Sequence, residues 1–419
     1  MYLSKNSLKT FALLLICFSM LRCKNEDQIP KPQLPPTILS ISPKTGQPGT
    51  LVKIRGNNFS KNKSENHVKF NDVTAELLSA SDTLLEVLAP QSSSGVVEVS
   101  VKSENLVGPD FKYYNIYCFG RNNYYAAYWK DGIPTNLVIN GFIHDMAISD
   151  QDIHAIGWIT DNGRIPMYWE NGQSVELEDL TENDELIGIC TSGKDIYICG
   201  TRSNEFPYHK TLRYWKNGSL IHESEASTES YIKVKDIAVN GNDVFIVGQE
   251  YPNAILWKNG TPISLSDGMG VDEANRIKII GTDIHIIGTR YIPGNVLIRY
   301  WKNEILTSIG NLNTGAAIDF TFSESDIFIT GYKNSLVYST ERLIPKYWRN
   351  DIEHTLSNSP TNRYGASIEV TDDALYILNN EFGLSFPYNS ILTKNGKPIT
   401  PYFGSGVTGT INGFLLVYY

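Results

Sequence analysis

The feature that most constrains the fold is a five-residue motif that returns at a nearly constant interval from residue 128 onward. One copy reads Tyr-Trp-Lys-Asn-Gly at residues 214–218. The tryptophan position is spaced by 40, 46, 42, 44, 47 and 45 residues and is occupied, in order, by Trp129, Trp169, Trp215, Trp257, Trp301, Trp348 and Thr393. Repeats of this length are typical of arrays in which each unit contributes four short strands.

A second motif precedes each copy of the first and reads Asp, then Ile or Val, then an aromatic residue or His. Its copies begin at Asp152, Asp195, Asp243, Asp283 and Asp326, with the variants Asn115 and Ala374. Glycine follows three residues after the aromatic residue or His in all copies except the last, which has Asn379. An alternating run before this motif and another after the tryptophan motif bring each period to four strands. The Asn-Gly or Asp-Gly pair after the third strand predicts a type I′ hairpin turn.

Four antiparallel strands per period without a helical pattern predict a β-propeller over residues 115–419. We expect seven blades, although six or eight would follow if one unit were split or shared differently. Residues 409–419 repeat the first and second strands of a unit, so we expect two final strands to complete the blade that begins at residue 115. A ring closed with both ends in one blade exposes no sheet edge.

Residues 37–114 have a different pattern, with short alternating strands and frequent turn residues. This pattern predicts a small antiparallel sandwich of immunoglobulin type. The segment also resembles the IPT/TIG domain family, in Ser42-Pro43 before the Gly-x-x-Gly-Thr turn at 46–50, in Gly-Asn-Asn-Phe at 56–59 and in Gly-Val-Val-Glu-Val at 95–99. The resemblance implies an Ig-like fold that serves as a spacer or binding module and carries little chemistry of its own.

The first 22 residues have the pattern of an export signal, because Lys5 and Lys9 precede an apolar run at 11–20 that is too short to span a bilayer. Cys23 follows directly, and residues 21–23 resemble a bacterial lipoprotein cleavage site, although Arg22 departs from the small residue usual there. The resemblance implies a lipid on Cys23; ordinary secretion is the alternative. Residues 23–36 contain four prolines and predict an extended linker.

The expected location is the outer membrane, with the protein surface-exposed or otherwise periplasmic. Residues 24–27 resemble the tag that sends Bacteroidetes lipoproteins to the outer face of that membrane. The repeat region likewise resembles uncharacterised Trp-Lys-Asn-Gly repeat lipoproteins of Bacteroidetes, a resemblance that implies no activity.

The net charge excludes nucleic acid as an expected partner. The chain carries a formal charge of −9, and removal of residues 1–22, with their three basic residues and no acid, would make it −12. Phosphate binding needs a basic footprint. Cys190 and Cys199 flank one predicted hairpin and are either paired or free; we expect free, buried thiols.

The repeated side chains have structural roles in our interpretation. We expect the Asp of the second motif to accept backbone N–H bonds within its turn, the tryptophans to fill space between blades, and the motif lysines to be solvated. Glycoside hydrolysis needs two particular carboxylates, and the repeat singles out no such pair. His154 and His285 take the place of aromatic residues, and the acidic run at 266–273 lacks the spacing of a calcium loop. We therefore predict no catalytic residue, no metal and no cofactor.

The loops that join second and third strands should all emerge on one face, where they differ between units and are aromatic. The candidate ligand-binding residues are Tyr124, Tyr125, Trp158, Phe206, Tyr208, Tyr251, Tyr291, Tyr332, Tyr338, Phe386 and Tyr388. Aromatic residues beside polar ones suit a glycan or a protein partner. They are equally suited to closing the tops of blades.

We therefore expect a non-catalytic binding lipoprotein whose partner is a glycan or a surface protein. One alternative is a propeller polysaccharide hydrolase or lyase, which should have a cluster of Asp, Glu or His at the ring centre that breaks the repeat. A purely architectural surface protein is the other alternative.

Overall fold

The computed structural model describes residues 34–203, 210–225, 231–307, 315–337, 340–350, 352–356, 362–372, 374–382, 390–399 and 409–419. Within these ranges nearly all regular structure is β-strand, and the one helical element is the 3-10 turn η1 (Lys63–Glu65). No helix in the described part of the chain is long and apolar enough to cross a membrane. The expected export signal and Cys23 lie outside the described residues.

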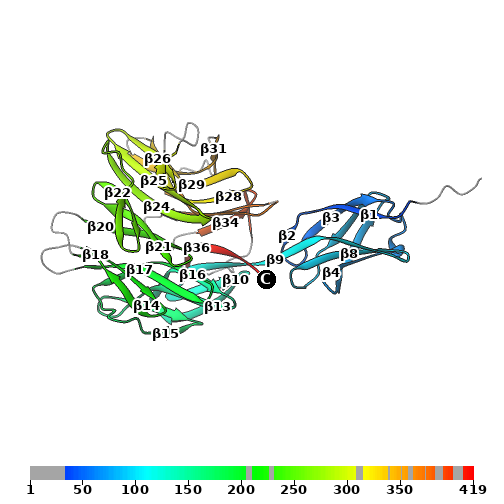
Figure 1. Ribbon diagram of the computed structural model, residues 1–419, viewed down its shortest axis with the longest axis horizontal. Coiled ribbons are helices and arrows are strands. Elements are labelled where there is room, and N and C mark those ends of the chain that lie inside the picture. Colours follow the sequence, from blue (N-terminus) through cyan, green and yellow to red (C-terminus); the bar gives the residue numbers. More distant parts are fainter. Residues whose placement is uncertain are drawn as a thin grey trace, which may run out of the picture.

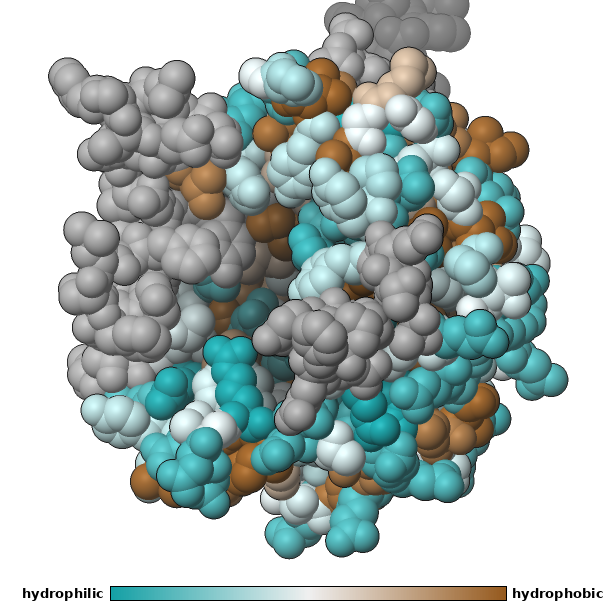
Figure 2. Space-filling model, turned by 90° about the vertical axis from the view of Figure 1, so that its left-hand side faces the viewer, coloured by the Kyte–Doolittle hydropathy of each residue, from teal (hydrophilic) through white to brown (hydrophobic). Residues whose placement is uncertain are grey.

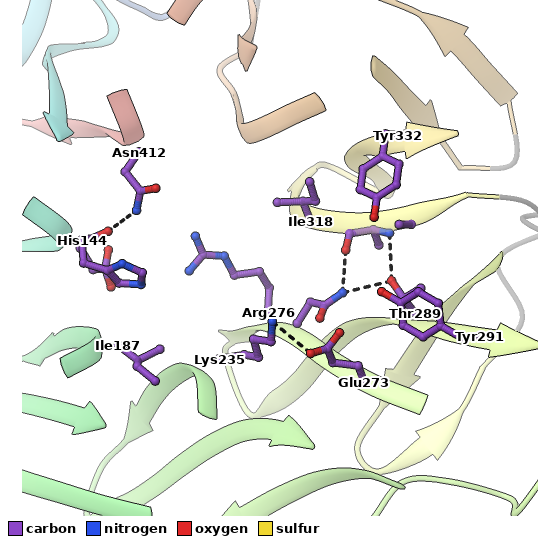
Figure 3. Close-up of a pocket in the computed structure, with 14 residues that line it drawn as sticks. His144, Ile187, Lys235, Glu273, Arg276, Thr289, Tyr291, Ile318, Tyr332 and Asn412 are labelled. Carbon is purple, nitrogen blue, oxygen red and sulfur yellow. Dashed lines mark hydrogen bonds and ion pairs between the residues drawn. The ribbon is translucent and has the colours of Figure 1, made fainter. Parts of the chain in front are cut away.

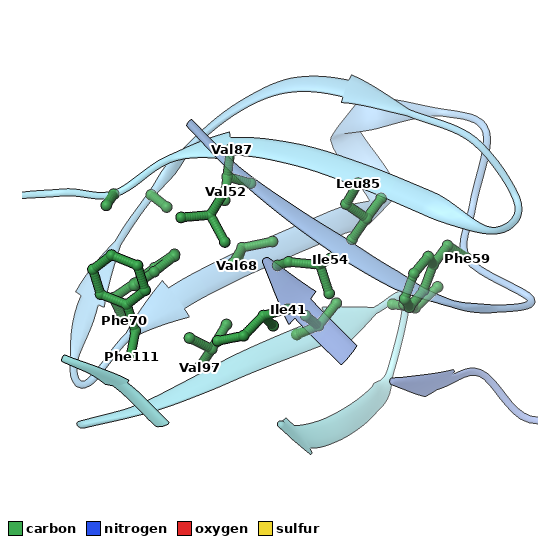
Figure 4. Close-up of a cluster of buried hydrophobic side chains, with 14 of the residues drawn as sticks. Ile41, Val52, Ile54, Phe59, Val68, Phe70, Leu85, Val87, Val97 and Phe111 are labelled. Carbon is green, nitrogen blue, oxygen red and sulfur yellow. The ribbon is translucent and has the colours of Figure 1, made fainter. Parts of the chain in front are cut away.

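The N-terminal part is an Ig-like sandwich (Figure 1). Its strands are β1 (Thr37–Ser42), β2 (Thr45–Gly46), β3 (Leu51–Asn57), β4 (Asn66–Phe70), β5 (Val73–Thr74), β6 (Glu76–Ala80), β7 (Leu84–Leu88), β8 (Gly95–Val101) and β9 (Glu104–Asn122). One sheet has the order β1-β3-β7-β6, and β9-β8-β4-β5 form the other. Alternate residues of β3 are buried, as period-two patterning predicts. Val52, Ile54, Leu85 and Phe111 pack into the shared core shown in Figure 4.

Strand β9 belongs to both parts of the molecule. It is 19 residues long, and its first half pairs with β8. Its second half pairs with β10 (Tyr125–Lys130) on one side and β36 (Gly409–Tyr418) on the other. The two parts are therefore joined by a continuous strand at residues 114 and 115, without an intervening linker.

The rest of the chain forms four-stranded antiparallel sheets. One has the order β36-β9-β10-β11, with β11 at Ile133–Ile139. The six that follow are four consecutive strands each: β12 (Gly141–Ser149), β13 (Asp152–Thr160), β14 (Arg164–Glu170), β15 (Gln173–Val175); β16 (Asp184–Ser192), β17 (Asp195–Ser203), β18 (Lys210–Lys216), β19 (Ser219–Glu223); β20 (Ile232–Asn240), β21 (Asp243–Glu250), β22 (Asn253–Lys258), β23 (Thr261–Ser264); β24 (Val271–Ile280), β25 (Asp283–Ile292), β26 (Asn295–Lys302), β27 (Ile305–Leu306); β28 (Ala316–Ser323), β29 (Asp326–Val337), β30 (Thr340–Arg349), β31 (Ile352–Thr355); β32 (Asn362–Val370), β33 (Leu375–Phe382), β34 (Ser390–Lys394), β35 (Lys397–Pro398).

The first strands of these sheets, here called the inner strands, follow one another in space. β12 contacts β16, and the series continues through β20, β24, β28 and β32 to β36, which contacts β12 again. The prediction of two final strands is wrong, because residues 409–418 form the single strand β36. β9 already supplies the second strand of that sheet, and a bulge at Asn412 lets β36 continue along it.

The repeated tryptophans are structural, as predicted: all six are 3% exposed or less. Trp215, for example, packs with Ile156 and Tyr168 of the preceding sheet. The residue at the Asn position of each motif copy has a φ between 48° and 55°, which fits the predicted type I′ turn. Each sheet is thus ended by a tight turn and anchored on its neighbour by one large side chain.

The expected role of the repeated Asp is wrong in detail. Asp195 accepts a hydrogen bond from the amide of Asn217 at 2.8 Å, and Lys216 pairs with it at 2.8 Å. Asn217 in turn accepts the backbone N–H of Ile196. The Asn therefore accepts the backbone N–H that we assigned to the Asp, and the motif lysine is exposed, as expected, and also pairs with the Asp. In the next repeat, Asp243 makes the same two contacts with Asn259 and Lys258.

The repeated glycine of the second motif lies opposite a bulge in the inner strand, and Asn379 takes this place in the last sheet, beside the bulge at Ala366. Gly248 lies opposite the bulge at Lys235, and a Cβ there would meet the carbonyl oxygen of Lys233. Gly157 and Gly288 are placed likewise against the carbonyls of their own inner strands. The bulges matter because each of them changes the direction of one side chain of an inner strand.

The three cysteines of the described residues, Cys118, Cys190 and Cys199, are free thiols. Burial raises the pKa of each thiol well above its ordinary value. His154 and His285 are buried as predicted, and the Nδ1 of each lies within hydrogen-bond distance of a tyrosine hydroxyl.

Candidate functional site

The bulged residues of the inner strands surround a cavity of about 330 Å³. The register of each sheet slips at one residue of its inner strand, and these bulged residues are Asn412, His144, Ile187, Lys235, Asn275, Ile318 and Ala366. All except Ala366 line the cavity, although they come from strands far apart in the sequence. The site is therefore a product of the repeat geometry, filled with side chains that differ from one repeat to the next (Figure 3).

Arg276 is the central cation of this cavity. Its guanidinium points into the space between the His144 and Tyr332 sides (Figure 3). The nearest carboxylates are Asp236, 3.5 Å from Nη1, and Asp319, 3.9 Å from Nε. Both distances exceed the 2.7 to 2.9 Å, roughly, of a charge-assisted hydrogen bond. The guanidinium is thus electrostatically compensated while its donors still face the cavity.

The aspartates beside Arg276 tie neighbouring inner strands together. Asp236 accepts the backbone N–H groups of Ile237 and Ile277, at 3.0 and 2.9 Å, and so links β20 to β24. Asp319 accepts the N–H of Ile368 at 3.1 Å and links β28 to β32 in the same way. Their main role is therefore to hold strands, which leaves Arg276 without a close bidentate partner.

His144 and Asp145 share one wall of the cavity and have opposite pKa shifts. Burial lowers the pKa of His144 to about 4, and the positive charge of Arg276 adds to this. Burial raises the pKa of Asp145 to about 7 despite the opposing effect of Arg276. Both oxygens of Asp145 accept backbone N–H bonds, one of them from Ile189 of the next inner strand at 3.0 Å. Asp145 therefore repeats the strand-holding role of Asp236.

Another wall of the cavity combines an ion pair with two aromatic rings. Lys235 pairs with Glu273 at 3.0 Å. Tyr291 and Tyr332 line the same side (Figure 3), and burial followed by the charge of Glu273 raises the pKa of both phenols. The wall thus offers flat apolar surface next to charged groups that neutralise one another.

The cavity lies on the face away from the Ig-like domain. The turns between second and third strands are on this face, whereas β9 enters from the opposite side (Figure 1). Figure 2 looks onto the face away from the Ig-like domain. This face is hollowed between polar and apolar side chains. Farther along the inner strands, Lys278 pairs with Glu369 at 2.9 Å across β28.

The predicted aromatic residues are divided by the structure. Tyr291 and Tyr332 line the cavity. Trp158, stacked between Phe142 and Arg164, lies outside it, as do Tyr124, Tyr125 and Tyr251, which are exposed. The remaining candidates lie outside the described residues: Phe206, Tyr208, Tyr338, Phe386 and Tyr388.

The polar lining was missed by the sequence analysis, although a signal for it exists. Seven residues before the Asp of the second motif stand Asp145, Asp236, Arg276 and Asp319, where an alternating inner strand should be apolar. Each is preceded by the bulged residue that lines the cavity. Aligning the first strands of the units, in place of their loops, would have found the site.

The acidic run at 266–273 is neutralised by arginine. Arg290 donates to Asp272 at 2.6 Å and to Asp267 at 3.0 Å. Arg213 and Asp184 form an equivalent pair at 2.9 Å two sheets earlier. These pairs fix the loops that lead into β24 and β16, and the described residues contain no cluster of His, Cys, Asp and Glu able to hold a metal.

Sequence comparison places relatives over the N-terminal part. Residues 36–115 match the IPT/TIG domain family. The cyclomaltodextrin glucanotransferase of Bacillus sp. (strain 1-1) is 28% identical in an alignment of 138 residues that covers 31% of this chain. The chain spans only 18% of that enzyme's length, so the enzyme's activity does not carry over.

Solved structures resemble the chain only loosely. A protein of unknown function from Bacteroides thetaiotaomicron has a TM-score of 0.34 and 13% identity, with 83% of this chain and 96% of that chain covered. An auxiliary nutrient binding protein from Bacteroides ovatus has a TM-score of 0.34 and 14% identity over the same shares. Scores this low carry no argument about function. The motifs and the family match of the N-terminal part agree, and residues 36–115 are an IPT/TIG domain.

Proposed function

We propose that the seven four-stranded sheets form a seven-bladed β-propeller and that the chain is a non-catalytic binding lipoprotein. The closed series of inner-strand contacts supports the ring, because each sheet then has a neighbour on both sides. The partner is a glycan or a surface protein, bound on the face that carries the cavity. The IPT/TIG domain acts as a spacer.

The observation that carries this proposal is the cavity around Arg276. Its volume of about 330 Å³ falls within the range, roughly 300 to 1,000 Å³, of small-ligand sites. A guanidinium with long contacts to its compensating carboxylates retains donors for a ligand. Aromatic rings beside convergent polar groups complete the usual composition of such a site.

The position of the site fits an anchored protein. β1 begins at the end of the IPT/TIG domain far from the propeller (Figure 1). A lipid on Cys23 and the proline-containing linker would therefore leave the cavity facing away from the membrane. Replacing Cys23 with Ser should move the protein from the membrane fraction to the soluble fraction, and unchanged partitioning would remove the lipid anchor from the proposal.

Binding by a form of the chain without the anchor cysteine, residues 24–419, tests the proposed role. The chain should bind members of a glycan array or a protein from the cell surface, and Arg276→Met should reduce that binding at least tenfold, the loss of about 1.4 kcal/mol. Tyr231→Ala is the matched control, because Tyr231 is exposed outside the cavity. Equal binding by both variants and the wild type would place the site elsewhere.

One observation favours the hydrolase alternative. His144, Asp145 and Glu273 lie around one cavity, and the pKa of Asp145 fits a general acid near neutral pH. Against this, both oxygens of Asp145 hold backbone N–H groups and Glu273 is paired with Lys235. Turnover of a polysaccharide panel that is abolished by Glu273→Gln would establish the enzyme and overturn the binding role.

The architectural alternative makes a separate prediction. A ligand that binds the native state must raise the melting temperature. If no glycan or surface protein raises it, the chain has only a structural role.

A further inference from the structure

The cavity contains hydrogen-bond acceptors as well as donors that can bind a ligand. Nδ2 of Asn275 donates to Thr289 Oγ1 at 3.1 Å and to the Ala317 carbonyl at 2.7 Å. Nδ2 of Asn412 donates to the His144 carbonyl, and its Oδ1 is turned to the cavity (Figure 3). Since both amide NH₂ groups are engaged with protein, the two carbonyl oxygens remain for a ligand.

Donors and an acceptor therefore face the same space. Arg276 supplies N–H donors at the centre, and the amide oxygen of Asn412 is turned into the same cavity (Figure 3). A hydroxyl group both donates and accepts, and so matches such a wall at every position. A carboxylate or sulfate only accepts, and would oppose the amide oxygens.

The charge balance also disfavours an anion. Lys235 is neutralised by Glu273 at 3.0 Å. Arg276 lies among Asp236, Asp319 and Asp145, and all three of these carboxylates raise its pKa. A buried anionic ligand would find no uncompensated cation and would meet carboxylates on several sides, an arrangement that costs free energy.

The aromatic side of the cavity gives a flat surface for a ring. Tyr291 and Tyr332 lie on it, and Ile187 and Ile318 add apolar surface among the bulged residues. A pyranose has an apolar face of C–H groups and a rim of hydroxyls, so it needs both kinds of wall at once.

We propose that the cavity binds a neutral sugar residue and discriminates against uronic or sulfated sugars. This inference rests on the proposed binding function and names the class of ligand for the same site. The discrimination follows from the paired charges, and recognition follows from hydroxyls bound by Arg276 and the Asn412 amide oxygen.

The test is calorimetry on residues 24–419 with neutral trisaccharides of glucose, galactose, mannose, xylose and fructose, and with trigalacturonic acid. A neutral trisaccharide should bind, with affinity that changes less than about twofold between about 20 mM and about 500 mM salt, because screening acts only on charged ligands. Tyr332→Ala should weaken binding about tenfold, whereas Tyr231→Ala should bind like the wild type.

A second variant tests the charge argument. Ile187→Lys adds an uncompensated cation to the wall and should create salt-sensitive affinity for trigalacturonic acid. Wild-type preference for trigalacturonic acid would overturn the neutral class but leave the cavity as the site. Failure of both classes to bind, or binding indifferent to Tyr332→Ala and Arg276→Met, would overturn the glycan form of the proposed function as well.

Discussion

The carboxylate of Asp372 accepts the hydroxyl of Thr45 at 2.6 Å, although the two residues are 327 positions apart. Asp372 also accepts the backbone N–H of Lys44 at 2.6 Å. On the other side of β9, Gln47 donates to Asp131 at 2.7 Å. The last and first four-stranded sheets therefore both hold the turn before β3, which fixes the orientation of the IPT/TIG domain.

Asp372→Ala should loosen this junction. The Lys44 amide loses its acceptor, so its hydrogen exchange should become at least about tenfold faster, while exchange of the buried Val52 stays unchanged. The control is Asp82→Ala, which changes an exposed aspartate of the IPT/TIG domain. Equal exchange of Lys44 in both variants would mean that β9 alone fixes the two parts.

Gly248→Ala should destabilise the protein by about 2 to 3 kcal/mol, the usual cost of forcing atoms into packed space. The added methyl group would meet the Lys233 carbonyl opposite the bulge. Gly163→Ala, where a Cβ meets open space, should be nearly neutral. Urea unfolding compares the two, and similar midpoints would contradict the account of the repeated glycine.

Asn217 should tolerate Gly better than Ala. Asn217→Gly loses the bond to the Ile196 N–H but keeps the φ of 49°, whereas Asn217→Ala loses both and should cost about 1 kcal/mol more. Lys216→Ala removes an exposed ion pair and the contact of the ammonium group with the Tyr197 ring, and should have the smallest effect. The order of unfolding free energies is the readout. Equal losses for Gly and Ala would contradict it.

Removal of His144 should reveal the titration of Asp145. Asp145 has a pKa raised from 3.8 to about 7, so it binds a proton in the fold that the unfolded chain releases, and stability falls as pH rises between these values. His144, lowered from 6.5 to about 4, has the opposite effect over nearly the same range. In the wild type the two slopes largely cancel.

His144→Gln should therefore lose stability more steeply than the wild type from about pH 4.5 to 6.5, by up to about 1.4 kcal/mol per pH unit, the limit for one proton. His67→Gln, at an exposed site in the IPT/TIG domain, should follow the wild type. Urea unfolding at several pH values measures both. Parallel profiles for all three proteins would show that the cavity does not shift the pKa values of His144 and Asp145.

The sequence predicted those features of the fold that depend on short-range rules and recur in every repeat. The period, the positive φ at the Asn of each motif and the burial of residues such as Trp215 follow from spacing, turn chemistry and apolar size. The partner of Asp195 was not predictable, because which of two nearby polar groups serves a backbone N–H depends on the register between strands. The cavity was missed because a single-residue bulge redirects Lys235 and Asn275 without altering the pattern of apolar residues.

The most direct test of the binding account is a crystal structure of residues 24–419 soaked with the neutral trisaccharide that binds best. The account predicts a sugar ring in the cavity, packed on Tyr291 or Tyr332, with hydroxyls on the Arg276 guanidinium and the Asn412 amide oxygen. A sugar bound only at an outer residue such as Trp158, with the cavity holding water alone, would contradict it.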